Sequence, residues 1–333
     1  MANFSLEDVK ALRERLGTGM VDTKNALVEA DGDIEKAVEI LRLKGAKGNA
    51  KRADRSTSEG LIAVVESATA VTMIELACET DFVAKNDKFV ALAEKVVAAL
   101  ADSGAETVDA ALAVAVDGGT VGSLIEDQAA TIGEKVELRQ VSRIAGEKFA
   151  VYLHRTSKDL PPQIGVVVAY TGDDADTARS VAQHISFAAP VYLSREDVPE
   201  AEVANERRIV EQISREEGKP EAALPKIVEG RLGAFFKQVS LLEQDYARDN
   251  KLSISKVLAD AGLTVTGFAR FKVGAVAYLT YLTIVAETDQ MIAFIDMSIG
   301  QILTISGDII LGLAFRITLL LLVMAILDYA FQR

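Results

Sequence analysis

The sequence predicts an α+β protein in which antiparallel strands and helices occupy separate layers. Between residues 60 and 273, apolar runs typical of strands form clusters joined by short polar links, and stretches with helical spacing lie between these clusters. A doubly wound parallel sheet would instead need strands and helices to alternate one by one. We therefore expect a three-helix N-terminal domain, a two-part antiparallel α+β core, a helical hairpin and an apolar helical tail.

Composition narrows the class of function. The 333 residues include 36 Lys and Arg against 49 Asp and Glu, which gives a formal net charge of −13. Because nucleic-acid binding relies on cationic contacts to phosphate, so acidic a chain favours protein or small-molecule partners. The single cysteine, Cys78, excludes an internal disulfide and fits a reducing compartment, and residues 1–10 lack the apolar core of an export signal. We expect a cytoplasmic protein of two or three domains.

The first predicted domain, residues 1–46, consists of three short helices. Ser5 and Asp8 have the spacing of a capping box at the start of the first helix. A Gly-Thr-Gly stretch ends that helix, Asp33 is placed to cap the third helix, and Gly45 is placed to end it. The expected inner face consists of Val9, Leu12, Leu16, Ile34, Ala37, Val38 and Leu41.

So small a core predicts a domain that docks onto another surface. Met20 and Val21, apolar and next to the glycine turn, are candidates for that docking surface, although the pattern also allows them to lie in the core. Residues 47–58 are polar, basic and rich in small side chains, and we interpret them as a linker with solvated charges rather than as a phosphate site.

The predicted core spans residues 59–198. Apolar runs at residues 61–65 and 71–78 indicate one hairpin, and runs at residues 136–144 and 149–154 indicate a second. The other elements expected here are a helix from about residue 87 to 100, a helix at 121–132, a strand at 164–170 and a helix at 176–189.

A charged helical pattern follows the core. Residues 199–237 are expected to form an antiparallel helical hairpin that turns at a Gly-Lys-Pro sequence. Residues 238–275 would complete the core with a helix at 254–261 and a closing strand at 263–273.

Residues 79–86 link the first hairpin to the next helix and place an acid beside a large aromatic ring at an expected turn. In one interpretation, Phe82 covers the core and Asp81 or Asn86 caps the following helix. In the other, the two side chains point outward toward another molecule. The octapeptide alone leaves both interpretations open.

Motifs for covalent chemistry are absent from the sequence. There is no phosphate-binding G-x-x-x-x-G-K-[ST] loop, no G-x-S-x-G elbow, no paired-cysteine motif and no metal-ligand spacing. The two histidines, His154 and His184, lack a nucleophile in an obvious context, and Cys78 is expected to be a buried thiol. We expect a protein that is not an enzyme and needs neither cofactor nor metal.

Six ordered motifs resemble those of the elongation factor Ts family. They lie at residues 12–27, 75–86, 132–134, 152–154, 226–231 and 268–274. The resemblance covers residues 1–275 and departs from the common pattern at Leu16, Thr18 and Thr23. Residues 155–162 lengthen the chain after His154, as in the actinobacterial version of the family.

The resemblance implies a guanine-nucleotide exchange factor that binds elongation factor Tu and promotes GDP release by disturbing the magnesium and phosphate site. It implies that the first domain is similar to a ubiquitin-associated domain and that the helical hairpin is a coiled coil. It assigns Arg13, Met20, Val21 and Lys24 to the contact with the partner's nucleotide-binding domain. It assigns Asp81 and Phe82, with the partner-binding residues Thr80 and Val83 beside them, to the exchange wedge, and His154 to a more distal contact.

Residues 276–333 lie outside this resemblance. Residues 309–327 are apolar apart from Arg316 and long enough to span a bilayer, and residues 328–333 resemble a junction in the flagellar and type III secretion export-switch family. The tail is either a membrane anchor, a foreign segment, which we favour, or a helical pair packed on the body. The alternative function is a non-catalytic, membrane-tethered adaptor.

Overall fold

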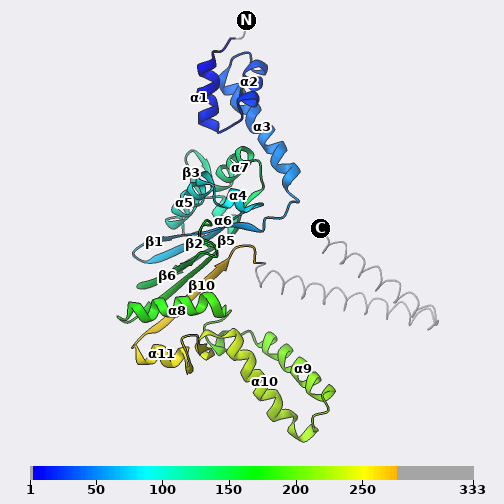
Figure 1. Ribbon diagram of the computed structural model, residues 1–333, viewed down its shortest axis with the longest axis vertical. Helices are drawn as coiled ribbons and strands as arrows, with labels where there is room; N and C mark the ends of the chain where they lie inside the picture. Colours follow the sequence, from blue (N-terminus) through cyan, green and yellow to red (C-terminus); the bar gives the residue numbers. More distant parts are fainter. Residues whose placement is uncertain (1–2, 276–333) are drawn as a thin grey trace, which may run out of the picture. The chain divides into compact units, whose positions relative to one another are not determined.

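A computed structural model describes residues 3–275 of the chain (Figure 1). The helices are α1 (Leu6–Leu16), α2 (Met20–Glu29), α3 (Ile34–Arg52), α4 (Asp81–Ala84), α5 (Asp87–Ala101), α6 (Val108–Leu112), α7 (Val121–Ile132), α8 (Ala175–Ala188), α9 (Glu200–Glu216), α10 (Leu224–Val239) and α11 (Ile254–Asp260). The strands are β1 (Glu59–Glu66), β2 (Ala70–Cys78), β3 (Ala115–Val116), β4 (Gly119–Thr120), β5 (Val136–Ala145), β6 (Lys148–His154), β7 (Ile164–Thr171), β8 (Asp245–Tyr246), β9 (Asp249–Ser253) and β10 (Thr264–Lys272). The mixed α+β class with antiparallel sheets is confirmed.

The apolar tail, residues 276–333, lies outside the described residues. The same holds for the segment expected to span a bilayer, residues 309–327. Within residues 3–275, no helix combines the length and the apolar character needed to cross a membrane.

The three N-terminal helices form where the sequence predicts them. Ser5 and Asp8 make the expected capping box, and Asp33 caps α3 by accepting hydrogen bonds from two backbone amides. The small core of this unit contains Val9, Leu12, Ala26, Leu27, Ala30, Ala37, Val38 and Leu41. Ile34, expected on the inner face, is exposed instead.

Gly45 does not end the third helix, because α3 continues to Arg52 and takes up the first half of the expected linker. A side chain at Gly45 would come within 2.8 Å of Ala130 Cβ on α7. Asn49 Nδ2 donates to the backbone oxygen of Glu126, also on α7, over 2.9 Å. Gly45 therefore allows α3 to pack closely against α7, and α3 continues past this glycine as a helix.

Two three-stranded antiparallel sheets, in the orders β1-β2-β5 and β10-β7-β6, make up the centre of the described structure. The expected hairpin of residues 136–144 and 149–154 is wrong, since β5 pairs with β2 and β6 pairs with β7. Ile144 and Phe149 belong to one apolar cluster between the sheets. Placing the two strands in different sheets lets both side chains pack, partly buried, against this cluster.

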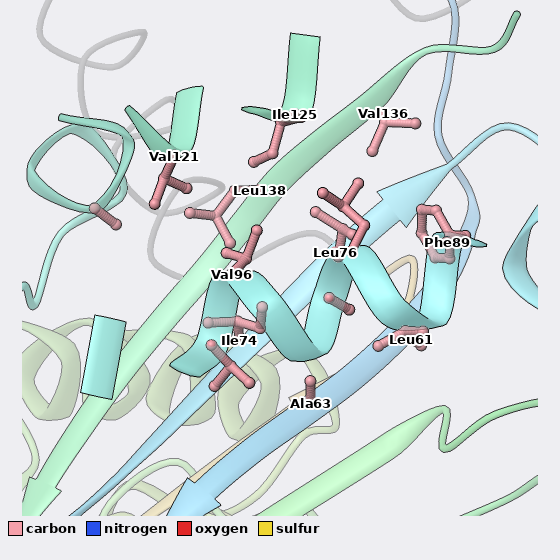
Figure 2. Close-up of a cluster of buried hydrophobic side chains, with 14 of the residues drawn as sticks. Leu61, Ala63, Ile74, Leu76, Phe89, Val96, Val121, Ile125, Val136 and Leu138 are labelled. Atoms are coloured by element: carbon pink, nitrogen blue, oxygen red, sulfur yellow. The ribbon is translucent and has the colours of Figure 1, made fainter. Parts of the chain in front are cut away.

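Helix α5 covers the outer face of the first sheet. Figure 2 shows Phe89 and Val96 of this helix beside Leu61 of β1 and Leu76 of β2. Phe89 is fully buried, in agreement with the helical spacing seen in the sequence. The loop expected after α5 contains further elements, namely α6 and the short β3–β4 hairpin.

The second sheet packs against α8 and α11, and the α9–α10 hairpin follows α8 in sequence. Val210 on α9 and Val228 and Leu232 on α10 form the apolar seam of this hairpin. Arg231 also reaches Glu217 across the turn at 2.7 Å. The antiparallel helical hairpin expected at residues 199–237 is thus present.

The interface between the two sheets depends on Gly165, which gives a test of the fold. A Cβ at this position would lie 2.4 Å from Ile62 Cγ2 and 2.9 Å from Met73 Sδ. We expect Gly165→Ala to lower the free energy of unfolding by about 1–3 kcal/mol through overpacking. Denaturant unfolding measures this change.

Gly230→Ala is the matched control, because a methyl group at Gly230, on the exposed side of α10, meets no atom within 4 Å. We expect it to stabilise the protein by about 0.5–1 kcal/mol, since alanine is the better helix former. An unchanged stability of Gly165→Ala would contradict the tight sheet packing.

Candidate functional site: an exposed aromatic tip

Residues 79–86 contain the short helix α4, Asp81–Ala84, rather than an open turn alone. Thr80 caps α4 with its hydroxyl, which accepts from the backbone N–H of Val83. Asn86 caps α5 by accepting from the backbone N–H of Lys88 over 2.9 Å. Of the two candidate caps for α5, Asn86 is therefore correct and Asp81 is not. We call residues 80–84 the α4 tip.

Phe82 projects into solvent from the α4 tip, with 72% of its surface exposed. The interpretation in which it covers the core is wrong. Lys85 Nζ lies 4.5 Å from the centroid of its ring and also 3.2 Å from the carboxylate of Asp81. Val83 packs partly against the core and Ala84 is fully buried. The tip thus presents an acid and an aromatic ring on an anchored base.

Glu134 ties the α4 tip to the end of α7. Its carboxylate accepts the backbone N–H groups of Glu79 and Thr80, each over 3.1 Å, and the Thr80 hydroxyl over 2.6 Å. Glu79 in turn accepts from the backbone N–H of Lys135 and pairs with Arg55. These charge-assisted bonds satisfy the backbone just before the tip and restrict its movement.

Reasoning from residues alone missed the role of Glu134, because 54 residues separate it from Thr80. The only signal was its place in the motif at residues 132–134. Cys78 lies just below the tip, and burial, with the nearby charges of Glu134 and Glu59, raises the pKa of its thiol to about 12. A thiol with that pKa stays protonated and serves as a core residue, as expected.

The N-terminal candidates lie on the surface of the three-helix unit. Arg13 is on α1, Met20, Val21 and Lys24 are on α2, and all four are exposed. Met20 and Val21 therefore do not belong to the core. Beneath them, the Thr23 side chain is buried and hydrogen-bonded to Thr18 and to the backbone of Gly19.

His154 ends β6 and is exposed, with its Nδ1 atom 3.1 Å from the Tyr152 hydroxyl. His184 is buried on α8, where its Nδ1 accepts from the backbone N–H of Ala247 and its Nε2 bonds to Gln244 Oε1. Burial lowers the pKa of His184. His154 is thus a residue at the end of a strand, and His184 is a buried helix residue with hydrogen-bond partners.

Helix α7 connects two of the three candidate regions. Thr131, in its last turn, donates a hydrogen bond to the backbone oxygen of Leu16 at the end of α1. Three residues later, Glu134 holds the α4 tip. His154 lies apart from both, on the second sheet. Within residues 3–275, no group of acidic, histidine or cysteine side chains is arranged to hold a metal ion.

Comparisons with known proteins identify two matching families. The family model described as "Elongation factor TS" matches residues 79–275. The model described as "FlhB HrpN YscU SpaS Family" matches residues 248–333, so the similarity to the export-switch family begins well before the apolar tail.

Curated relatives match the same part of the chain as the first model. Elongation factor Ts of Leifsonia xyli subsp. xyli is 71% identical over 276 residues, which cover 83% of this chain and all of the relative. Elongation factor Ts of Clavibacter sepedonicus is 70% identical, and that of Tropheryma whipplei is 57% identical. Both relatives are matched over their full length, by 83% and 82% of this chain respectively. The chain therefore belongs to the elongation factor Ts family.

Proposed function

We propose that this member of the elongation factor Ts family binds elongation factor Tu in its GDP-bound form and uses the α4 tip to promote GDP release. The family places the protein in translation elongation as a nucleotide exchange factor. The observation that carries the proposed mechanism is the exposure of Phe82 on a tip fastened by Glu134. A non-catalytic adaptor, the alternative function, would not need a side chain that displaces nucleotide.

In the proposed mechanism, Phe82 enters the GTPase and Asp81 approaches its metal site. Phosphate and Mg²⁺ hold the switch elements of a GTPase in place, so a conformation that accommodates Phe82 binds both poorly. The coupling is reciprocal, because GDP must then weaken the binding of the exchange factor by the same factor.

Burial of one side chain can supply the free energy needed to weaken GDP binding. A hundredfold loss of GDP affinity needs about 2.7 kcal/mol at ~1.4 kcal/mol per tenfold change. Burying one large apolar side chain contributes about 1.5–3 kcal/mol. Phe82, exposed in the free protein, can supply most of this on insertion, and no covalent step is needed.

The remaining contacts would hold the partner in place while the wedge acts. We propose that Arg13, Met20, Val21 and Lys24 bind its nucleotide-binding domain and that His154 binds a more distal domain. Thr80 and Val83 would support the wedge from within the tip. This role places the protein in the cytoplasm.

The domain division expected from the sequence also stands as a proposal. It separates the ubiquitin-associated-like unit, the linker, the core, the helical hairpin, the end of the core and the tail. The proposed ranges are 1–46, 47–58, 59–198, 199–237, 238–275 and 276–333. Residues 47–52 of the linker belong to α3.

Replacing Phe82 by alanine tests the wedge directly. We expect Phe82→Ala to slow release of a fluorescent GDP analogue from elongation factor Tu by about tenfold to a hundredfold, in line with the loss of about 1.5–3 kcal/mol of apolar burial. Stopped-flow fluorescence measures the release rate.

Phe187→Ala is the matched control, because Phe187 is 84% exposed at the end of α8 and belongs to none of the proposed contacts. It should leave the rate unchanged. Release unaffected by Phe82→Ala would move the exchange mechanism to the other contacts. Absence of any release by the wild-type chain would contradict the function itself.

The apolar tail should be dispensable for exchange, because the aligned relatives are covered in full by about 83% of the chain. We expect a chain ending at residue 275 to release GDP from elongation factor Tu as fast as the full chain does, within about twofold. The same fluorescence assay compares the two proteins, with thermal unfolding as the check on folding. Loss of exchange on truncation would show that the tail takes part.

A further inference from the structure

Strand β1 forms an edge of its sheet, and only the first half of that edge is covered. The Ile62 N–H donates to the backbone oxygen of Pro162 over 2.9 Å, and Gln163 Nε2 donates to the backbone oxygen of Gly60 over 2.7 Å. We call residues 155–162 the strap. Together with Gln163 it occupies the place of a neighbouring strand beside the start of β1.

The second half of this edge carries backbone groups without a partner. In an antiparallel pair, alternate residues of an edge strand direct both backbone groups away from the neighbouring strand. Since Gly60 and Ile62 face outward, Val64 does so too. No backbone hydrogen bond within residues 3–275 reaches the outward groups of Val64. Proteins usually protect such an edge, because it can pair with another chain.

The open edge lies in a slot between two layers of the structure. A cavity of about 440 Å³ runs along Leu61–Val65 of β1. Val90, Glu94 and Val97 of α5 line one side, and Leu153 of β6 with the strap lines the other. Figure 1 shows β1 between α5 and β6 at this edge. An added strand would extend the sheet with Val90 and Val97 on one side and Leu153 on the other, and charged side chains such as Glu94 and Arg155 beside them.

The slot also joins two of the contacts proposed above. Lys85 lines the cavity and also contacts Asp81 and Phe82 of the α4 tip. Leu153 and Arg155, the neighbours of His154 in sequence, line the cavity as well. The cavity therefore borders residues next to both contacts, and a partner that touches both can reach the open edge of β1 through it.

We propose that an extended segment of elongation factor Tu adds to the β1 edge at Val64 as a fourth strand. Backbone hydrogen bonds to Val64 would give affinity, and alternate apolar side chains of the segment would enter the slot, as in other cases of strand addition. This inference rests on the proposed function, because it assigns the strand to that partner.

Amide hydrogen exchange tests the proposal residue by residue. In the free full-length chain, the Val64 amide should exchange rapidly and the Ile62 amide, already bonded to Pro162, should exchange slowly. Adding nucleotide-free elongation factor Tu should slow exchange at Val64 at least tenfold and leave Ile62 nearly unchanged. Slower exchange across the α4 tip reports independently that the complex has formed.

A proline at the same position provides a second test. Val64→Pro removes the outward N–H without removing a bond to β2. It should weaken the complex about tenfold, whereas Val64→Thr, which keeps the N–H and the branched side chain, should leave affinity unchanged. Circular dichroism of both variants checks the fold, and the hydrogen-exchange result stands even if Val64→Pro does not fold.

Each other outcome overturns the proposal. If the α4 tip is protected in the complex but Val64 is not, the partner binds without adding a strand. If Val64 is already protected in the free chain, the edge is occupied by the chain itself, or by a second copy when protection rises with protein concentration. If neither region is protected, no complex forms, and the proposed function fails together with the added strand that rests on it.

Discussion

The carboxylate of Glu134 is the interaction on which the proposed site depends. It accepts three hydrogen bonds from two consecutive residues at the base of the α4 tip, and it lies two residues after α7, a helix that is itself fixed to the core. A four-residue helix has no stability of its own, because nucleating a helical turn is unfavourable. The bonds to Glu134, with the buried Ala84, therefore determine where Phe82 points.

This arrangement explains how the protein keeps a large aromatic side chain in water. Phe82 contributes little to the stability of the free protein, since most of its surface is exposed. Its apolar surface remains available for burial in a partner. A flexible tip would lose conformational entropy on insertion, and part of the binding energy would be spent on ordering it. A tip held by α7 avoids most of that cost.

Helix α7 also links the α4 tip to the N-terminal helices through Thr131 and Leu16. The extension of α3 to Arg52 strengthens this link, because Gly45 and Asn49 bring α3 against α7. The N-terminal candidates and the α4 tip are thus supported by the same helix, although they come from different parts of the sequence. His154 depends on the second sheet, which meets the first through the close contact at Gly165.

Features set by neighbouring residues could be predicted from the sequence. Helix α5 followed from the spacing of Phe89 and its apolar partners, and the caps at Ser5 and Asp33 followed from local side chains. Features set by distant partners could not. Gly45 looked like a helix stop because its neighbour on α7, Ala130, is far from it in sequence and gives no local signal.

Long-range pairing caused the other errors. The strands β5 and β6 looked like a hairpin, since nothing local shows that β2 and β7 are their partners. Glu75, fully buried within β2, is explained by hydrogen bonds from Gln140 and the backbone N–H of Gly274 and by Arg139 at 3.5 Å. The sequence shows Asp81 and Phe82 in the link between β2 and α5, but their exposure had to come from the structure.

A double-mutant cycle tests the central claim most directly. We would measure GDP release from elongation factor Tu promoted by the wild-type chain, Glu134→Ala, Phe82→Ala and the double variant. If Glu134 acts by holding Phe82 in place, the double variant should be no slower than the slower single variant, within about twofold. Effects that simply multiply would show that the two residues act independently, since coupling appears as a departure from additivity. That result would contradict the account of a braced wedge.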